Sequence, residues 1–127
     1  MAKEAAKKVM LVEDDPTQSM MYELEFKNNG YHVIIADNGA KALKTAVLEQ
    51  PDIIFLDMIL GDMSGLELLK RLKAEPKTKN IKTVVLSNLQ KKEIIDEAKA
   101  VGALDFLVKM HFFPKDVVAR CNKYLNS

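Results

Sequence analysis

The chain has 127 residues, 48% of them hydrophobic, which suits one domain with a substantial buried core. Its net charge of +1 argues against direct nucleic-acid binding, and no apolar run approaches the ~20 residues that cross a bilayer, which excludes membrane insertion. The single Cys121 excludes an internal disulfide. We therefore expect a single cytoplasmic domain over residues 1–127, with a polar N-terminal extension at 1–7 and a buried structural thiol.

The first half of the chain alternates strand-like and helical segments. The apolar run 9–12 predicts a buried strand, and the helix that follows starts after the cap Asp15 and stops at Asn29. A second strand, 31–36, is less uniformly apolar and suits the edge of a sheet. Asn38 is the expected cap of the second helix.

The second half continues this alternation. Ser64 and Glu67 form the S-x-x-E pattern of a capping box at the start of a third helix. The fourth helix is expected to stop at Gly102, and the fifth to begin at Pro114. Three further strands are expected over 53–56, 83–86 and 106–108.

Five successive strand–helix units predict a doubly wound α/β fold. Strands that alternate with helices of this length form a parallel sheet with helices on both faces, joined by right-handed crossovers. We expect a flavodoxin-like, five-stranded parallel sheet of strand order 2-1-3-4-5 with five helices. In this order, strands one and three flank the point where open α/β sheets bind ligands.

Reactive polar residues follow four of the predicted strands. Because the carboxyl ends of parallel strands lie at one edge of the sheet, we expect their side chains to converge. Asp14 and Asp57 have the oxygen ligands that Mg²⁺ prefers, and an aspartate carboxylate can attack phosphorus. A hydroxyl and an ammonium group nearby complete the equipment for phosphoryl transfer. The residues concerned are Glu13-Asp14-Asp15, Asp57, Ser87 and Lys109.

These residues resemble the receiver domains of two-component response regulators, in particular the single-domain, chemotaxis-type regulators. The resemblance extends from Val9 to Leu125. It rests on Val-Glu-Asp-Asp at 12–15, on the run 51–57 that ends in aspartate with Gly65 eight residues later, and on the hydroxyl and the lysine at their expected strand ends. Each match alone has little specificity, but their order and context together are highly specific.

The resemblance implies a phospho-acceptor and a metal site. It implies that Asp57 accepts a phosphoryl group from a sensor histidine kinase, a phosphotransfer protein or a small phosphodonor. Glu13 and Asp14 would form the acidic pair for Mg²⁺, with Asp57 and the backbone carbonyl of Ile59 as further ligands.

The resemblance also implies a switch. Ser87 and Lys109 would contact the transferred phosphoryl group. Phe106 would rotate inward when Ser87 moves toward that phosphoryl group. The surface formed by the fourth helix, fifth strand and fifth helix would then bind a downstream protein, or an output domain outside this chain. Such a domain catalyses only its own phosphorylation and dephosphorylation, so we do not expect an enzyme.

The sequence departs from the family pattern close to these residues. Met110 follows Lys109 where the family usually has a proline, often after a cis peptide bond. A cis bond to a non-proline residue costs roughly 2.5–4 kcal/mol, so we expect a trans bond and a differently shaped loop. Gly61 replaces a common proline and loosens the loop after Asp57. Asn88 replaces a small residue, and we expect it to crowd the site or to add a donor.

Two apolar residues lie at positions that influence the approach of hydrolytic water in this family. They are Ile59 and Leu89. We therefore expect the acyl phosphate to hydrolyse slowly.

Two other classes of function are compatible with parts of this sequence. A degenerate receiver could serve as a phosphorylation-independent interaction or dimerisation module, with Met110 and Asn88 as signs of decay; retention of the reactive residues argues against it. A small enzyme is the other class. An aspartyl phosphatase would need a second Asp where Ile59 stands, and a flavin-binding protein could share the architecture. No G-x-x-x-x-G-K-[ST] or G-x-G-x-x-G motif provides a cradle for nucleotide phosphates.

Overall fold

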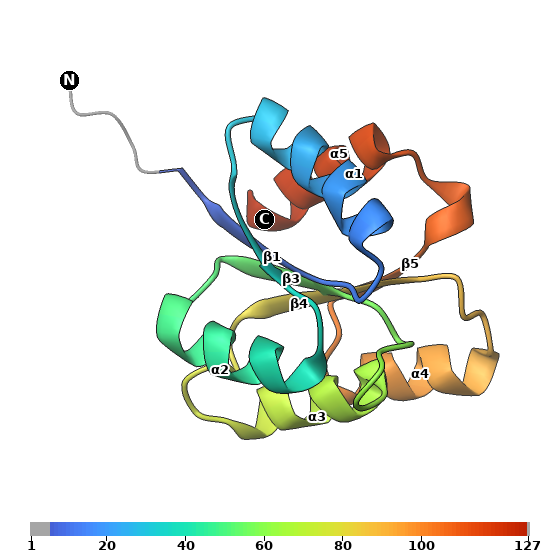
Figure 1. The fold of residues 1–127 in the computed structure, drawn as a ribbon. Helices are drawn as coiled ribbons and strands as arrows, with labels where there is room; N and C mark the ends of the chain where they lie inside the picture. Colours follow the sequence, from blue (N-terminus) through green and yellow to red (C-terminus); the bar gives the residue numbers. More distant parts are fainter. Residues whose placement is uncertain (1–5, 127) are drawn as a thin grey trace.

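The computed structural model describes residues 6–126, in which five strands and five α-helices alternate along the chain (Figure 1). The strands are β1 (Lys8–Val12), β2 (His32–Ala36), β3 (Ile53–Leu56), β4 (Lys82–Ser87) and β5 (Asp105–Val108). The helices are α1 (Pro16–Asn28), α2 (Gly39–Glu49), α3 (Gly65–Ala74), α4 (Lys92–Val101) and α5 (Pro114–Leu125), with a short 3-10 helix, η1 (Lys109–His111), before α5.

The strands form one parallel sheet in the order β2-β1-β3-β4-β5, which confirms the predicted doubly wound fold. β2 lies at an edge, as its mixed sequence indicates. Val12 pairs with Leu56, and Ser87 pairs with Val108. The residues that follow β1 and β3, the last residue of β4 and the residue that follows β5 therefore meet at one edge of the sheet.

Helices cover both faces of the sheet, α1 and α5 on one and α2, α3 and α4 on the other (Figure 1). Side chains of β1 alternate between the two faces: Met10 packs in the core under α2–α4, and Leu11 in the core under α1 and α5. In the second core, the rings of Phe26 and Phe55 lie 5.6 Å apart. Cys121 is buried in the same core, which confirms its structural placement.

The start of α3 differs in part from the prediction. The Ser64 hydroxyl accepts a hydrogen bond from the Glu67 N–H at 3.0 Å, as expected. The Glu67 carboxylate, however, pairs with Arg71 at 3.0 Å and does not complete the capping box. A cation one turn further along the helix competes for this carboxylate.

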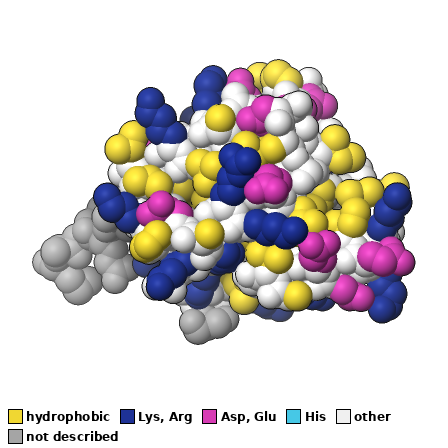
Figure 2. Space-filling model, turned by 90° about the horizontal axis from the view of Figure 1, so that it is seen from below, with side chains coloured by type: hydrophobic (Ala, Val, Ile, Leu, Met, Phe, Trp, Pro, Cys, Tyr) yellow, Lys and Arg dark blue, Asp and Glu magenta, His cyan; other side chains and the backbone are white. Residues whose placement is uncertain are grey.

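The outer face of α2–α4 carries interspersed acidic and basic side chains among hydrophobic ones (Figure 2). One ion pair on it, Lys70–Glu97 at 3.1 Å, joins α3 to α4. Within residues 6–126, no helix has the length and apolarity to cross a membrane. Residues 1–5 of the predicted extension lie outside the described residues.

Candidate functional site

Asp57 lies directly after β3, and both of its carboxylate oxygens are held. Oδ1 accepts hydrogen bonds from the Ser87 hydroxyl at 2.6 Å and from the Ile59 N–H at 3.1 Å. Oδ2 accepts from the Lys109 ammonium at 2.7 Å. The Asp57 and Ser87 side chains are buried. The structure thus brings together three of the predicted residues from the ends of β3, β4 and β5.

The Lys109 ammonium binds three side chains of the site. Besides Asp57, it donates to Glu13 Oε2 at 2.6 Å and to Gln18 Oε1 at 2.6 Å. Three acceptors match the three protons of an ammonium group. The Lys109 and Glu13 side chains are only 8% exposed, so this ion pair is largely shielded from water.

Gln18 is a member of the site that the sequence interpretation missed. It lies in the first turn of α1, and its Nε2 donates to the cap residue Asp15 at 3.3 Å. Its position three residues after the cap was a usable signal, because the first turn of α1 starts at the same sheet edge as Glu13.

The charges of the cluster shift its acid–base equilibria. Burial by itself raises the pKa of Asp57, but hydrogen bonds from Lys109, Ser87 and Ile59 outweigh it and hold the pKa below its ordinary value. Burial raises the pKa of Glu13, and Lys109 offsets this only in part. Burial alone would lower the pKa of Lys109, yet Asp57 and Glu13 hold it above its ordinary value. At neutral pH, Asp57 is therefore an anion beside a cation.

The remaining predicted residues are placed less directly. Asp14 is exposed next to Glu13 at the same sheet edge, and the Ile59 side chain is exposed in the loop after β3. Phe106 is half-buried on β5 and packs against the core under α2–α4.

The oxygen donors at this edge are of the kind that suits a hard divalent cation. They are carboxylates, and hard cations such as Mg²⁺ take oxygen ligands. Within residues 6–126, no three His, Cys, Asp or Glu side chains are close enough to hold a metal ion in this arrangement. Lys109 instead bridges the two buried carboxylates.

The loop between β3 and α3 is fixed by a close backbone approach. Gly65 N–H donates to the Met58 carbonyl at 2.8 Å. A Cβ at Gly65 would lie 2.0 Å from the carbonyl oxygen of Asp57, so only glycine fits here. The backbone directly after Asp57 is thereby held against the start of α3.

A second contact fastens this loop to α2. The Asp62 carboxylate accepts hydrogen bonds from the N–H groups of Gly39 at 2.8 Å and Ala40 at 3.0 Å, and these bonds lower the pKa of Asp62. A Cβ at Gly61 would meet nothing within 4 Å. The clamp by Asp62 thus restrains the loop that Gly61 was expected to loosen.

The two departures beside Ser87 and Lys109 contact each other. No cis peptide bond occurs within residues 6–126, so the bond before Met110 is trans, as predicted. Asn88 Oδ1 accepts a hydrogen bond from the Met110 N–H at 2.8 Å. The amide oxygen of Asn88 therefore contacts the neighbouring loop, and the expectation that Asn88 crowds the site or adds a donor stays a prediction.

Sequence comparisons give a consistent family. A family model for the response regulator receiver domain matches residues 9–121. The chain is 32% identical over 102 residues to sporulation initiation phosphotransferase F of Bacillus subtilis, covering 80% of this chain and 81% of that protein. It is 32% identical over 121 residues to the alkaline phosphatase synthesis transcriptional regulatory protein PhoP of the same species, covering 94% of this chain. The chain spans about half of that regulator, 48% of its length.

Solved structures agree with this family. The chemotaxis response regulator CheY4 of Vibrio cholerae superposes with a TM-score of 0.85 at 29% identity, over 93% of this chain and 98% of that one. The Mn²⁺-bound form of response regulator Rcp1 superposes with a TM-score of 0.82 at 25% identity, over 95% and 96% of the two chains. The chain therefore belongs to the response regulator receiver domains, the phosphorylation-controlled signalling modules of two-component systems.

Proposed function

We propose that Asp57 is the phospho-acceptor of this receiver domain. The observation that carries the proposal is the buried Asp57 carboxylate, held by the Ser87 hydroxyl at one oxygen and by the Lys109 ammonium at the other. A carboxylate oxygen attacks the phosphorus of the donor, the bond from phosphorus to the donor's leaving atom breaks, and an acyl phosphate remains. The lowered pKa of Asp57 keeps the nucleophile ionised at neutral pH.

Ser87 and Lys109 act on the transferred group. Both already reach the oxygens of Asp57, so a hydroxyl and an ammonium lie within reach of a phosphoryl group attached there. Phosphoryl transfer depends on positioning and on charge stabilisation, which these two donors provide.

Mg²⁺ is the proposed cofactor. Asp14, Asp57 and the Ile59 carbonyl supply oxygen ligands, and Glu13 adds negative charge beside them. When bound, the cation screens the repulsion between the carboxylate and an incoming phosphoryl group. Asp14 is exposed and so is accessible to a hydrated ion.

The acyl phosphate is expected to be long-lived. Ile59 follows Asp57 by two residues with an exposed apolar side chain, and the half-buried Leu89 follows Ser87 by two. Neither side chain can orient an attacking water by a hydrogen bond. Loss of the phosphorylated form with Mg²⁺ present should be slow, and a half-life of seconds would count against this expectation.

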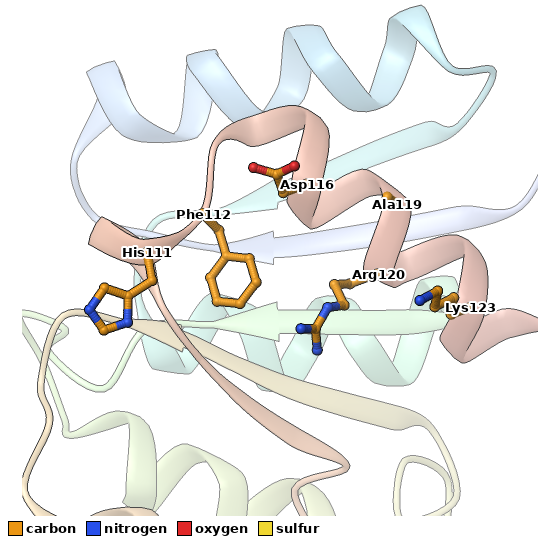
Figure 3. Close-up of a pocket in the computed structure, with 6 residues that line it drawn as sticks. All are labelled: His111, Phe112, Asp116, Ala119, Arg120 and Lys123. Atoms are coloured by element: carbon orange, nitrogen blue, oxygen red, sulfur yellow. The ribbon is translucent and has the colours of Figure 1, made fainter.

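Output is proposed to pass through the surface of α4, β5 and α5. Movement of Ser87 toward the phosphoryl group would free space for Phe106 to rotate, which biases this surface between two arrangements. At the α5 side of this surface, residues of η1 and α5 line a hollow of about 300 Å³ (Figure 3). The Arg120 guanidinium lies 5.1 Å from the centre of the Phe112 ring there. Arg120 also pairs with Asp105 at 3.5 Å.

The proposed partners follow from this role. A sensor histidine kinase or a phosphotransfer protein supplies the phosphoryl group, and a downstream protein or an output domain outside this chain receives the signal. The domain is not proposed to turn over a separate substrate. A cytoplasmic location stays a prediction from the lone, buried Cys121.

The test is transfer from a small donor. Incubation with acetyl phosphate and Mg²⁺ should add one phosphoryl group, seen by intact-protein mass, and Asp57→Asn should abolish it. Asp52→Asn is the matched control, because Asp52 is an exposed aspartate just before β3. An adduct that survives in Asp57→Asn, or none on the native chain, would overturn the proposal and favour the phosphorylation-independent module.

A further inference from the structure

The hydrogen bond between Asn88 and Met110 completes a closed loop of contacts that includes Asp57. Asn88 directly follows Ser87, and Met110 directly follows Lys109. Ser87 and Lys109 bind the two oxygens of Asp57 at 2.6 and 2.7 Å, and Asn88 binds the Met110 N–H at 2.8 Å. The two phosphoryl-contacting residues are thus joined at two points, through Asp57 and through the residues that follow them.

The contact lies where the sheet no longer holds the two loops together. The last backbone pair between β4 and β5 is Ser87 with Val108. One residue further, the Asn88 side chain supplies the acceptor that the backbone ladder lacks. A weaker contact, from Gln90 Nε2 to Met110 Sδ at 3.4 Å, lies in the same place.

The contact depends on the identity of both residues. Proline at position 110 has no N–H to donate, and a small apolar residue at position 88 has no acceptor. The Met110 side chain is 67% exposed, so packing of that side chain does not fix the loop. The loop is held by the bond from the Met110 N–H to Asn88, by the bonds of the Lys109 ammonium to Glu13, Asp57 and Gln18, and by the bond from the Phe112 N–H to the Lys109 carbonyl.

We propose that Asn88 is a positioning residue, whose amide sets the place of Lys109 relative to Ser87 and makes the two loops move together. The proposal rests on the proposed phospho-acceptor function of Asp57. With the bond in place, hydroxyl and ammonium meet the incoming phosphoryl group at a fixed separation. Without it, the Lys109 ammonium keeps its bonds to Gln18 and to the two carboxylates, but the charge of Asp57 changes during the transfer, and the link from Lys109 to the residue after Ser87 is lost.

Three variants separate positioning from general loop structure. Asn88→Ala removes the acceptor, Asn88→Asp keeps an acceptor oxygen, and Gln90→Ala removes only the contact to the Met110 sulfur. Phosphorylation rate constants are measured with acetyl phosphate and Mg²⁺ at high salt, which screens the charge added by the aspartate. Amide hydrogen exchange of Met110 reports the bond itself, and urea unfolding reports global stability.

The expected result is specific to the loss of the acceptor. Asn88→Ala should accelerate Met110 exchange and lower the phosphorylation rate constant by roughly three- to tenfold, the range that one net hydrogen bond supports. Asn88→Asp should restore both, and Gln90→Ala should leave both at the native values.

Other results would overturn the positioning role. If Asn88→Ala exposes the Met110 amide but phosphorylates at the native rate, or if Asn88→Asp protects the amide without restoring the rate, Asn88 does not position Lys109. A native chain that takes no phosphoryl group would instead sink the proposed function of Asp57, so the two failures are distinguishable.

Discussion

Replacement of Lys109 by methionine would remove the cation that binds both Glu13 and Asp57. Both carboxylates are buried, and their side chains are 8% and 10% exposed. Removal of one partner of a buried ion pair costs about 3–5 kcal/mol, because the remaining charge loses its compensation. Since Asp57 keeps its bonds from Ser87 and Ile59, we expect the lower end, about 3 kcal/mol at neutral pH.

The assay is urea unfolding followed by circular dichroism. In thermal unfolding of a domain of this size, a loss of about 3 kcal/mol would lower Tm by roughly 10 °C. The matched control is Lys92→Met, which breaks an exposed i,i+4 pair with Asp96 at 3.0 Å. Exposed pairs contribute little, so this control should change the free energy of unfolding by less than about 1 kcal/mol.

The cost of Lys109→Met should also depend on pH. The native pKa of Asp57 is lowered, so its stabilisation is present above the unfolded value of 3.8 and is lost as pH falls through the folded pKa. Acid should therefore shrink the difference between the native chain and Lys109→Met. A cost equal to that of Lys92→Met, or one that does not change as the carboxylates protonate, would show that Lys109 does not stabilise the two buried carboxylates.

Three further predictions concern the loop after β3, the metal site and the buried thiol. Gly65→Ala should lower the free energy of unfolding in urea by more than about 2 kcal/mol, because the new Cβ would lie 2.0 Å from the carbonyl oxygen of Asp57. Gly61→Ala should not destabilise the chain, because the new Cβ would meet nothing within 4 Å. Equal effects of the two substitutions would contradict the close backbone approach at Gly65. Mg²⁺ at a hundred times its Kd should raise the free energy of unfolding of the native chain by about 2.7 kcal/mol. Asp14→Asn should abolish this gain, whereas the control Asp37→Asn, at another exposed aspartate, should keep it. A gain retained in Asp14→Asn would exclude Asp14 as a metal ligand. Burial raises the pKa of Cys121 from 9.0 to about 11, so between pH 9 and 11 the folded state binds more protons than the unfolded state. The free energy of unfolding should therefore fall by up to about 3 kcal/mol as the pH rises through this range. Cys121→Ala should lose this part of the pH dependence, and an unchanged pH dependence would exclude the thiol as its cause.

The part of the site that the sequence predicts is the part set by the sheet. Asp57, Ser87 and Lys109 each end or follow a buried apolar run, and the edge at which parallel strands end is a property of the topology. Their convergence therefore needed no knowledge of side-chain conformation. The edge position of β2 was predictable for the same reason, from its weaker apolar pattern.

The missed parts depend on where individual side chains turn. Gln18 joins the site because its position around the axis of α1 brings its amide oxygen to Lys109, and the amide oxygen of Asn88 turns to the Met110 N–H on a neighbouring loop. The carboxylate of Glu67 likewise binds a nearby partner, Arg71 on its own helix, and does not reach back to the cap. Such choices are decided among several nearby partners in three dimensions, and a linear pattern does not rank them.

Chemical trapping of the acyl phosphate shows which residue carries the phosphoryl group. Borohydride reduces an aspartyl phosphate to homoserine, which peptide sequencing by mass spectrometry locates after treatment with acetyl phosphate and Mg²⁺. We expect homoserine at position 57 of the native chain and none in Lys109→Met within the time that the native chain needs for labelling. Homoserine at Asp14, Asp15 or another aspartate, with position 57 unmodified, would contradict it.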